Sequence, residues 1–178
     1  MDFEDIMRIL FILILFPLFI AAQSDQLVEF KINDQFDRLH THEEIQDTVV
    51  VLIGSGRPGS KYNMKWGHQL GVKLQKNGLF EGVIFVAHAD LRGVPGFLRG
   101  FVKSKFPQEE EKWVLLDWDG VLARSYDYDS KTSNILIFNQ KGSLVQHKTG
   151  LEPTEAEIDT LFQTVKQLVN RDPDHVRR

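Results

Sequence analysis

The chain has 178 residues, 42% of them hydrophobic and 26% charged, which suffices for one domain with a buried core and is short for two. Its formal net charge is −4, and phosphate binding needs a clustered excess of lysine and arginine, so we exclude nucleic acid as a partner. The chain contains no cysteine, which excludes disulfides, thiolate metal ligands and thiol-based catalysis.

The N-terminus carries an apolar run, residues 9–20, that has the length of a signal-peptide core and is followed by Ala21 and Ala22 as a cleavage site. We therefore predict a signal peptide over residues 1–22 and export to the periplasm or the extracellular space. The run is shorter than the roughly 20 residues that cross a bilayer, so a permanent anchor is the alternative, and an uncleaved segment is the one membrane contact expected. Acidic residues precede Met7, and translation starting at Met7 would remove them.

The first strands are predicted from alternation and from β-branched content. Residues 28–32 (VEFKI) alternate apolar and polar side chains, residues 33–34 form a turn, and residues 34–39 return as a hairpin. Residues 48–53 (TVVVLI) are β-branched or apolar throughout, as in a central strand that is covered on both faces.

A glycine-rich loop, residues 54–60 (GSGRPGS), follows this strand, and apolar spacing predicts a helix over residues 61–77. Residues 82–87 (GVIFVA) form the next buried strand. Because a helix joins these two buried strands, we predict a parallel crossover and a mixed sheet. Residues 90–106 are predicted to be a loop followed by a short helix from about Phe97.

The C-terminal half begins with a strand at residues 112–116 (KWVLL) that ends in an acidic turn. Residues 121–126 are either a short helix or an extended segment. Residues 134–147 are predicted to be a β-hairpin, in which Gly142 takes a positive φ at a tight turn.

A closing amphipathic helix is predicted up to Val169. It begins at Thr154, which forms a capping box with Glu157 three residues later. We place one domain at residues 23–170 and a flexible, charged tail at residues 171–178.

The glycine-rich loop contains a nucleotide-binding pattern. Residues 54–59 match G-x-G-x-x-G between a strand and a helix, which in a dinucleotide site brings backbone N–H groups to a pyrophosphate. The acidic residue best placed for the ribose is Asp90, 31 positions beyond Gly59 rather than the ~20 of that fingerprint. We therefore favour a strand-to-helix turn over nucleotide binding and expect no cofactor.

Residues 117–121 (DWDGV) resemble the first motif of haloacid-dehalogenase-type phosphatases, in which the first aspartate is the nucleophile and the pair binds Mg²⁺. That family needs further lysine and acidic motifs downstream, but only 57 residues follow Val121. We interpret the motif as an acidic turn after a strand.

His40 and His42, followed by Glu43 and Glu44, suggest metal ligands on one face of a strand. No defined third and fourth ligand accompanies them in the sequence. We therefore expect a solvated loop and no metal.

Residues 30–55 (FKINDQFDRLHTHEEIQDTVVVLIGS) resemble the opening of redoxin domains. Thioredoxins and peroxiredoxins carry their reactive cysteine between the central strand and the long helix, where this chain has residues 56–61 (GRPGSK). The cis-proline that faces this cysteine in thioredoxin-like proteins falls on Ser133. The resemblance implies an α/β, thioredoxin-like mixed sheet flanked by helices and closed by a C-terminal β-hairpin and helix.

Three further segments resemble the YtfJ-type exported proteins, a redoxin-fold group in which the catalytic cysteine is commonly lacking. They are residues 116–123 (LDWDGVLA), residues 133–142 (SNILIFNQKG) and the Val-Pro-Gly of residues 94–96. This resemblance implies a fold and an exported location, and it does not assign a reaction.

These observations predict a binding or scaffolding module of the cell envelope without thiol redox activity, with an unidentified protein or small ligand as partner. The alternative is an anion- or small-ligand-dependent enzyme that uses the former redox loop, with Ser55, Arg57, Ser60 and Lys61 at a helix N-terminus. A phosphatase-like or nucleotide-binding protein is the second alternative. Assistance to a cysteine-bearing redox partner also stays open.

Overall fold

A computed structural model describes residues 24–171, so the predicted signal peptide, the start at Met7 and residues 172–178 of the tail lie outside the described residues. The strands are β1 (Lys31–Asn33), β2 (Leu39–Thr41), β3 (Val49–Ser55), β4 (Val83–Asp90), β5 (Leu115–Asp117), β6 (Ser133–Phe138) and β7 (Leu144–Gly150). The α-helices are α2 (Ser60–Lys76), α3 (Arg99–Lys103), α4 (Val121–Ser125) and α5 (Glu155–Arg171), and the 3₁₀ helices are η1 (His42–Ile45), η2 (Phe80–Gly82) and η3 (Gly96–Leu98).

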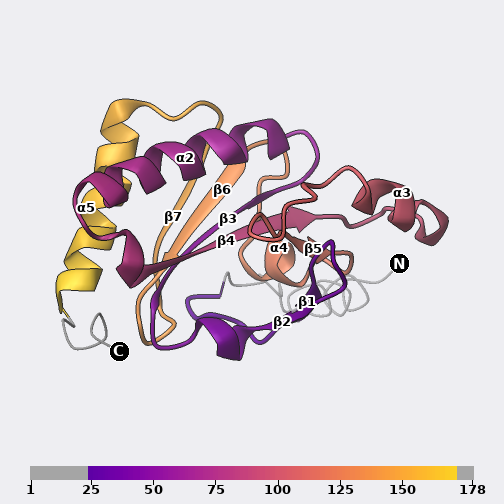
Figure 1. The fold of residues 1–178 in the computed structure, drawn as a ribbon, viewed down its shortest axis with the longest axis horizontal. Helices are drawn as coiled ribbons and strands as arrows, with labels where there is room; N and C mark the ends of the chain where they lie inside the picture. The colour runs from indigo at the N-terminus through magenta and orange to yellow at the C-terminus, as the bar shows by residue number, and fades with distance from the viewer. Residues whose placement is uncertain (1–23, 172–178) are drawn as a thin grey trace, which may run out of the picture.

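Five strands form one mixed sheet in the order β5-β4-β3-β6-β7 (Figure 1). β3 pairs with β4 in parallel, and β4 pairs with β5 in parallel, whereas β6 is antiparallel to both β3 and β7. The predicted parallel crossover through α2 and the predicted mixed sheet are therefore confirmed. A separate two-stranded sheet of β1 and β2 precedes them.

β3 lies at the centre of the sheet, and all seven of its residues are buried. Alternate side chains point to opposite faces, so Val51 and Ile53 join the core beneath α2 and α5, and Leu52 joins the core on the face of α4. Trp66 of α2 and Val165 of α5 are fully buried in the first of these cores. Each such side chain contributes about 1.5–3 kcal/mol by leaving water, which explains why residues 49–53 of this strand are all apolar.

The C-terminal hairpin and helix form as predicted. Gly142 has φ 75°, its N–H donates to Asn139 O at 2.9 Å, and the strands on either side are β6 and β7. α5 is opened by the predicted capping box, because Glu157 N–H donates to Thr154 Oγ1 (3.3 Å) and Thr154 N–H donates to Glu157 Oε2 (3.0 Å). The helix ends at Arg171, the first residue of the predicted tail.

The first predicted strand is displaced. β1 begins at Lys31 rather than at Val28, and it includes Asn33, which was expected in the turn. The N–H of Val28 donates instead to the hydroxyl of Tyr126 at 2.8 Å. Val28 and Phe30 pack into the core that also contains Tyr126. The alternation of apolar and polar side chains at residues 28–30 therefore reflects this packing and not pairing with another strand.

β5 is also shifted, and it is shorter than predicted. It starts at Leu115 rather than at residue 112, because the N–H of Val114 donates to Gln35 Oε1 at 2.8 Å instead of to a neighbouring strand. Residues 121–125, for which two conformations were open, form helix α4. No helix within residues 24–171 is both long enough and apolar enough to cross a membrane.

Candidate functional site

The loop between β3 and α2 lies where redoxins carry their reactive cysteine. Gly54 and Ser55, predicted to lie in this loop, extend β3 by two residues. The loop packs directly against the segment before β6: a Cβ atom at position 59 would collide with the carbonyl of Thr132, and one at position 56 would lie 3.0 Å from Ser130 O. Glycine at positions 56 and 59 therefore permits close approach of two backbones, and this contact brings the loop next to Ser133.

Ser55, Asn63 and Ser133 form a hydrogen-bonded chain at this contact, which we call the polar junction. Ser133 Oγ donates to Asn63 Oδ1 at 2.5 Å, and Asn63 Nδ2 donates to Ser55 Oγ at 3.0 Å. Both serines are buried. The junction therefore ties together the end of β3, the first turns of α2 and the start of β6.

The structure divides the predicted site residues into two groups. Ser55 and Ser133 meet through Asn63, whereas Arg57, Ser60 and Lys61 are exposed on the loop and the helix start. Ser60 Oγ donates to the carbonyl of Arg57 at 2.9 Å, and Lys61 Nζ lies 4.8 Å from the ring centroid of Tyr62. Of the predicted site residues, Ser55 and Ser133 are therefore a buried pair, and the other three are exposed to solvent.

Asn63 is the residue that the sequence reasoning missed. It precedes Trp66 by three residues and therefore shares the core-facing side of α2 with Trp66, Leu70 and Leu74, where an apolar side chain is expected. A polar residue at such a position is the signal that could have identified it. Its partners lie far away in the sequence, so they were not available from periodicity.

The polar junction has no group that would activate a serine. A serine nucleophile needs an adjacent base, but the hydroxyls of Ser55 and Ser133 are each bonded to a side-chain amide, which does not take up a proton. Burial also keeps both hydroxyls from a substrate. The arrangement is suited to holding the loop in place rather than to covalent catalysis.

Asp117 of the DWDGV motif is a buried helix cap. Its Oδ1 accepts from Val121 N–H and its Oδ2 from Leu122 N–H, both at 2.9 Å, and His88 Nε2 lies 3.1 Å from Oδ2. Burial by itself would raise the pKa of Asp117, but His88 and the two N–H donors outweigh it and hold that pKa below its ordinary value. Since both oxygens of Asp117 already accept hydrogen bonds and the residue is buried, the geometry supports the predicted acidic turn rather than a nucleophile.

The G-x-G-x-x-G pattern likewise serves packing. A Cβ atom at position 54 would lie 2.5 Å from His88 Nδ1 and 2.9 Å from the ring of Tyr128, so glycine is needed to make room for two buried aromatic rings. Asp90, the candidate ribose ligand, is held by the guanidinium of Arg92 at 2.8 and 2.7 Å. Neither residue is arranged to receive a nucleotide.

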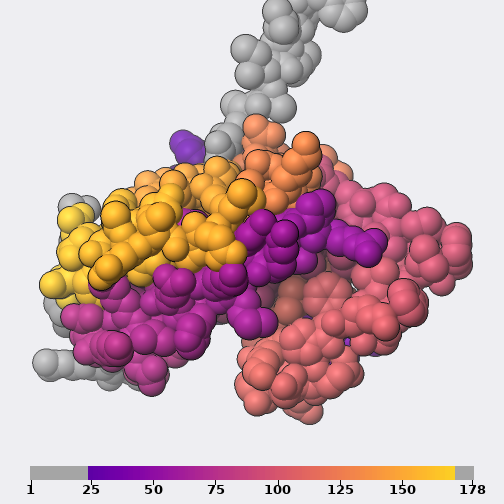
Figure 2. All heavy atoms as spheres, turned by 90° about the horizontal axis from the view of Figure 1, so that it is seen from above, coloured from indigo at the N-terminus to yellow at the C-terminus, as the bar shows by residue number. Residues whose placement is uncertain are grey.

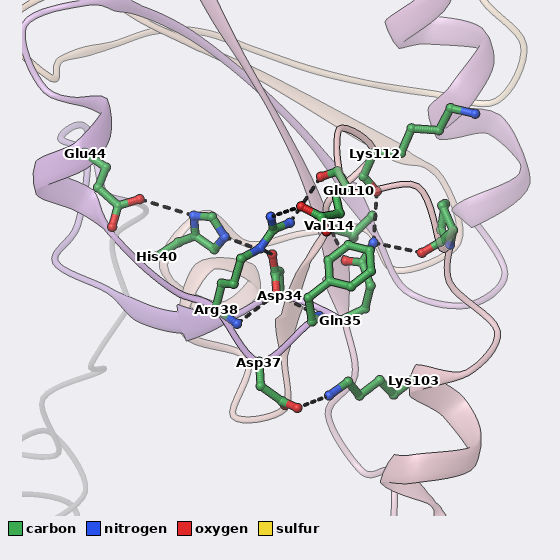
Figure 3. Close-up of polar contacts among 12 residues, drawn as sticks. Asp34, Gln35, Asp37, Arg38, His40, Glu44, Lys103, Glu110, Lys112 and Val114 are labelled. Carbon is green, nitrogen blue, oxygen red and sulfur yellow. Dashed lines mark hydrogen bonds and ion pairs between the residues drawn. The ribbon is translucent and has the colours of Figure 1, made fainter.

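Asp34 is the centre of another buried cluster, which Figure 3 shows with Arg38 and His40 pointing toward it. Arg38 Nε donates to Asp34 Oδ2 at 2.7 Å, and His40 Nε2 lies 3.2 Å from the same oxygen. Burial by itself would raise the pKa of Asp34, but the hydrogen bonds from Arg38 and His40 outweigh it and hold that pKa below its ordinary value. The cluster stabilises the β1–β2 hairpin, because it joins Asp34, which follows β1, to Arg38 and to His40 of β2.

The structure separates the two histidines that suggested a metal. His40 stacks on Trp113 with ring centroids 4.3 Å apart and lies between Asp34 and Glu44, whereas the ring of His42 lies edge-on to Phe30. Among the described residues, no group of three or more possible ligands is positioned to hold a metal ion. His40 is therefore part of the hairpin fastening and not of a metal pair.

Two cavities of about 250 and 350 Å³ lie on the α4 face of the sheet, next to the β1–β2 hairpin. The smaller is lined mainly by apolar side chains around Trp113, and the larger lies between the hairpin, α3 and the end of β5. Neither is lined by the polar junction or by the exposed loop residues.

No family model matches the chain, and no curated protein matches it. Solved structures do resemble it. An exposed lipoprotein thioredoxin from Streptococcus pneumoniae has a TM-score of 0.58 at 16% identity, and 79% of this chain is matched to 100% of that one. A candidate thiol:disulfide interchange protein, DsbE, from Chlorobium tepidum has a TM-score of 0.58 at 18% identity, with 83% and 98% of the two chains covered.

A lipoprotein of the SCO1/SenC family from Bacillus anthracis has a TM-score of 0.55 at 13% identity, with 81% of this chain and 95% of that one covered. At such identities the likeness shows the fold alone. The predicted fold class is confirmed: the chain has a thioredoxin-like fold, a mixed sheet flanked by helices and closed by a hairpin and a helix.

Proposed function

We propose that this protein is an exported binding or scaffolding module of the cell envelope that uses a thioredoxin-like scaffold without thiol redox chemistry, as the YtfJ-type resemblance implies. The polar junction is the observation that carries the proposal. In a chain without cysteine, an asparagine and two buried serines bond one another at the place where redoxins react. The side chains of the junction form hydrogen bonds with one another, and none of them is a thiol that could exchange electrons.

The surface above the junction supports partner binding. Arg57, Pro58, Ser60 and Lys61 are exposed there, on a loop whose glycines pack against the segment before β6. These exposed polar side chains line neither of the two cavities, and a small molecule needs a concave site, so they suit a protein surface better. The two cavities lie elsewhere, which agrees with a protein as the partner.

Export is supported by sequence and by likeness. The apolar run of residues 9–20 followed by Ala21 and Ala22 has the pattern of a cleaved signal. Two of the similar structures, from Streptococcus pneumoniae and Bacillus anthracis, are lipoproteins.

The experiment places a photo-crosslinking amino acid at Arg57 in the full chain, expressed in cells, with Lys141 as matched control. Lys141 is also an exposed cationic position, but it lies in the turn at the other end of β6. We expect an adduct of one defined mass from position 57 in the envelope fraction and none from position 141. N-terminal sequencing of the same material is expected to begin at residue 23.

Three results would contradict the proposal. Material confined to the cytosol would contradict export, and equal adducts from both positions would contradict a defined surface. Phosphate or sulfate that stabilises the wild type but not an Arg57→Ala, Lys61→Ala variant would favour the anion-dependent alternative, because a ligand raises stability only where it binds the native state.

A further inference from the structure

Strand β4 is only partly covered on the side away from β3. Its residues 83–89 pair with β3, but β5 pairs with residues 88–90 alone. β5 begins late because the N–H of Val114 donates to Gln35 Oε1 and not to β4. Within residues 24–171 no other strand pairs with β4, so residues 83–87, which we call the open stretch, have one unpaired side.

Peptide groups of the open stretch point to this unpaired side. Leu91 N–H donates to Asp117 O at 3.0 Å and therefore points toward β5. Peptide groups alternate sides along a strand, so the N–H and C=O of Phe85 and the C=O of Val83 point the same way. The N–H of Val83 is already bonded to Phe80 O. The open stretch therefore presents a donor and acceptors in the spacing that another strand would match.

The open stretch lacks the features that protect sheet edges from pairing. Natural edge strands carry charged residues, proline or bulges, and residues 83–87 (VIFVA) contain neither charge nor proline. β7, the outer strand at the other side of the sheet, has Lys148, and its pairing with β6 is shifted between Ile137 and Phe138. One edge of the sheet is thus protected, and the other is left able to pair.

An apolar cavity lies beside the open stretch. The cavity of about 250 Å³ is lined by Ile84 and Val86 of β4 and by Trp113 and Leu115. Ala87, whose side chain points to the opposite face, is exposed. A strand added here would place every second side chain toward the apolar cavity and the others toward solvent.

The surroundings of the open stretch favour a single extended chain as its occupant. Figure 2 shows the surface hollowed between the part of the chain that contains α2 and the part that leads from α3 to β5. Neighbouring strands lie only about 5 Å apart, so one extended chain fits beside β4. A second copy of this protein would have to bring an equally recessed edge to the same place. A lipid or a small molecule does not offer alternating N–H and C=O groups.

We propose that residues 83–87 of β4 bind an extended segment of a partner protein, which adds to the sheet as a strand. Backbone hydrogen bonds to Phe85 and Val83 hold the segment, and apolar side chains at alternate positions enter the cavity beside Trp113. This contact goes beyond the proposed function. Val83 pairs with Val49 at the start of β3, whereas the loop that contains Arg57 follows the end of β3.

The test selects partners for the full chain from a phage library of random peptides of about nine residues, long enough to span the open stretch. We expect the selected peptides to alternate apolar and polar residues and to lack proline. Each is then synthesised with one backbone N-methyl group at a time. N-methylation should weaken binding at least about fivefold at every second residue, where the N–H faces β4, and less than about twofold at the residues between.

Hydrogen exchange measured by NMR locates the bound peptide. The amide of Phe85 should become protected when the peptide binds, whereas the amide of Val86, which faces β3, should not change. This readout separates binding at β4 from capture of peptides by the apolar run of residues 9–20.

Two protein variants test the cavity. Ile84→Lys places a charge where apolar side chains of the peptide enter, and it should weaken binding at least about tenfold. Ala87→Lys is the matched control on the opposite, exposed face, and it should change binding less than about threefold. Thermal unfolding shows whether both variants fold, and the N-methyl series on the wild type decides the matter if Ile84→Lys does not.

Several results would overturn the added strand. They are a selection that yields no binding peptide, peptides without alternation, equal effects of N-methylation at all positions, or an unchanged exchange rate of the Phe85 amide in the complex. Sedimentation that shows a dimer of the wild type, dissociated by Ile84→Lys, would assign the open stretch to a second copy of this chain instead.

Discussion

Asn63 shows how one polar residue in an apolar register joins distant segments. Asn63→Ala removes the one amide that bonds both serines, so the buried hydroxyls of Ser55 and Ser133 lose their bonds to it. An unsatisfied buried polar group costs about 1–3 kcal/mol, so we expect the free energy of unfolding to fall by that amount in urea titrations. Ser60→Ala, which removes an exposed local bond, should change it by less than about 0.5 kcal/mol. Equal losses in the two variants would contradict the role of the junction.

Gly54 is a second position where one atom decides packing. Gly54→Ala would place a Cβ atom 2.5 Å from His88 Nδ1 and 2.9 Å from Tyr128, and overpacking of this kind costs about 1–3 kcal/mol. Gly100→Ala is the control, because its Cβ meets open space within a helix and should stabilise the protein by up to about 1 kcal/mol. Thermal unfolding of both variants tests this, and an unharmed Gly54→Ala would show that the two rings can move apart.

At the scale of elements, α4 depends on Asp117 for its N-terminal hydrogen bonds. The pKa of Asp117 is lower in the folded protein than in the unfolded chain, so its stabilising contribution is present above the unfolded pKa of about 4 and is lost as the pH falls through the folded pKa. Asp117→Asn should therefore be less stable than the wild type at pH 7, with a difference that shrinks at pH 3.

The matched control for this experiment is Asp119→Asn, an exposed carboxylate in the same turn. It should leave the stability unchanged within about 0.5 kcal/mol at both pH values. The difference in the free energy of unfolding between Asp117→Asn and the wild type could instead be as large at pH 3 as at pH 7. That result would contradict the prediction, because the loss would then come from altered packing and not from the charge of Asp117.

At the scale of the whole molecule, the central sheet and the N-terminal hairpin are held differently. β3 is buried and paired on both edges, whereas β1 and β2 form a sheet of their own that is fastened by polar bonds around Asp34. We expect amides of β3 and β6 to exchange hydrogen only by global unfolding, and those of β1 and β2 by local opening at lower free energy. Exchange measured by mass spectrometry tests this, and equal protection would contradict it.

Local patterns were enough to predict most elements of this fold. Residues 48–53, the hairpin around Gly142 and the capping box of Thr154 were placed from sequence, because a buried strand, a tight turn and a helix start are each determined by neighbouring residues. The errors fell at Val28 and Val114, whose backbone N–H groups bond to side chains about 80 to 100 positions away.

The sequence alone also determined that this chain supplies no thiol of its own, since it contains no cysteine. Only the tertiary structure decided that Asn63 joins Ser55 to Ser133, that Asp117 is buried against His88, and that Phe97 and Phe101 face outward. Burial and pairing depend on which segments the fold brings together, and residues tens of positions apart in sequence become neighbours only when the sheet has formed.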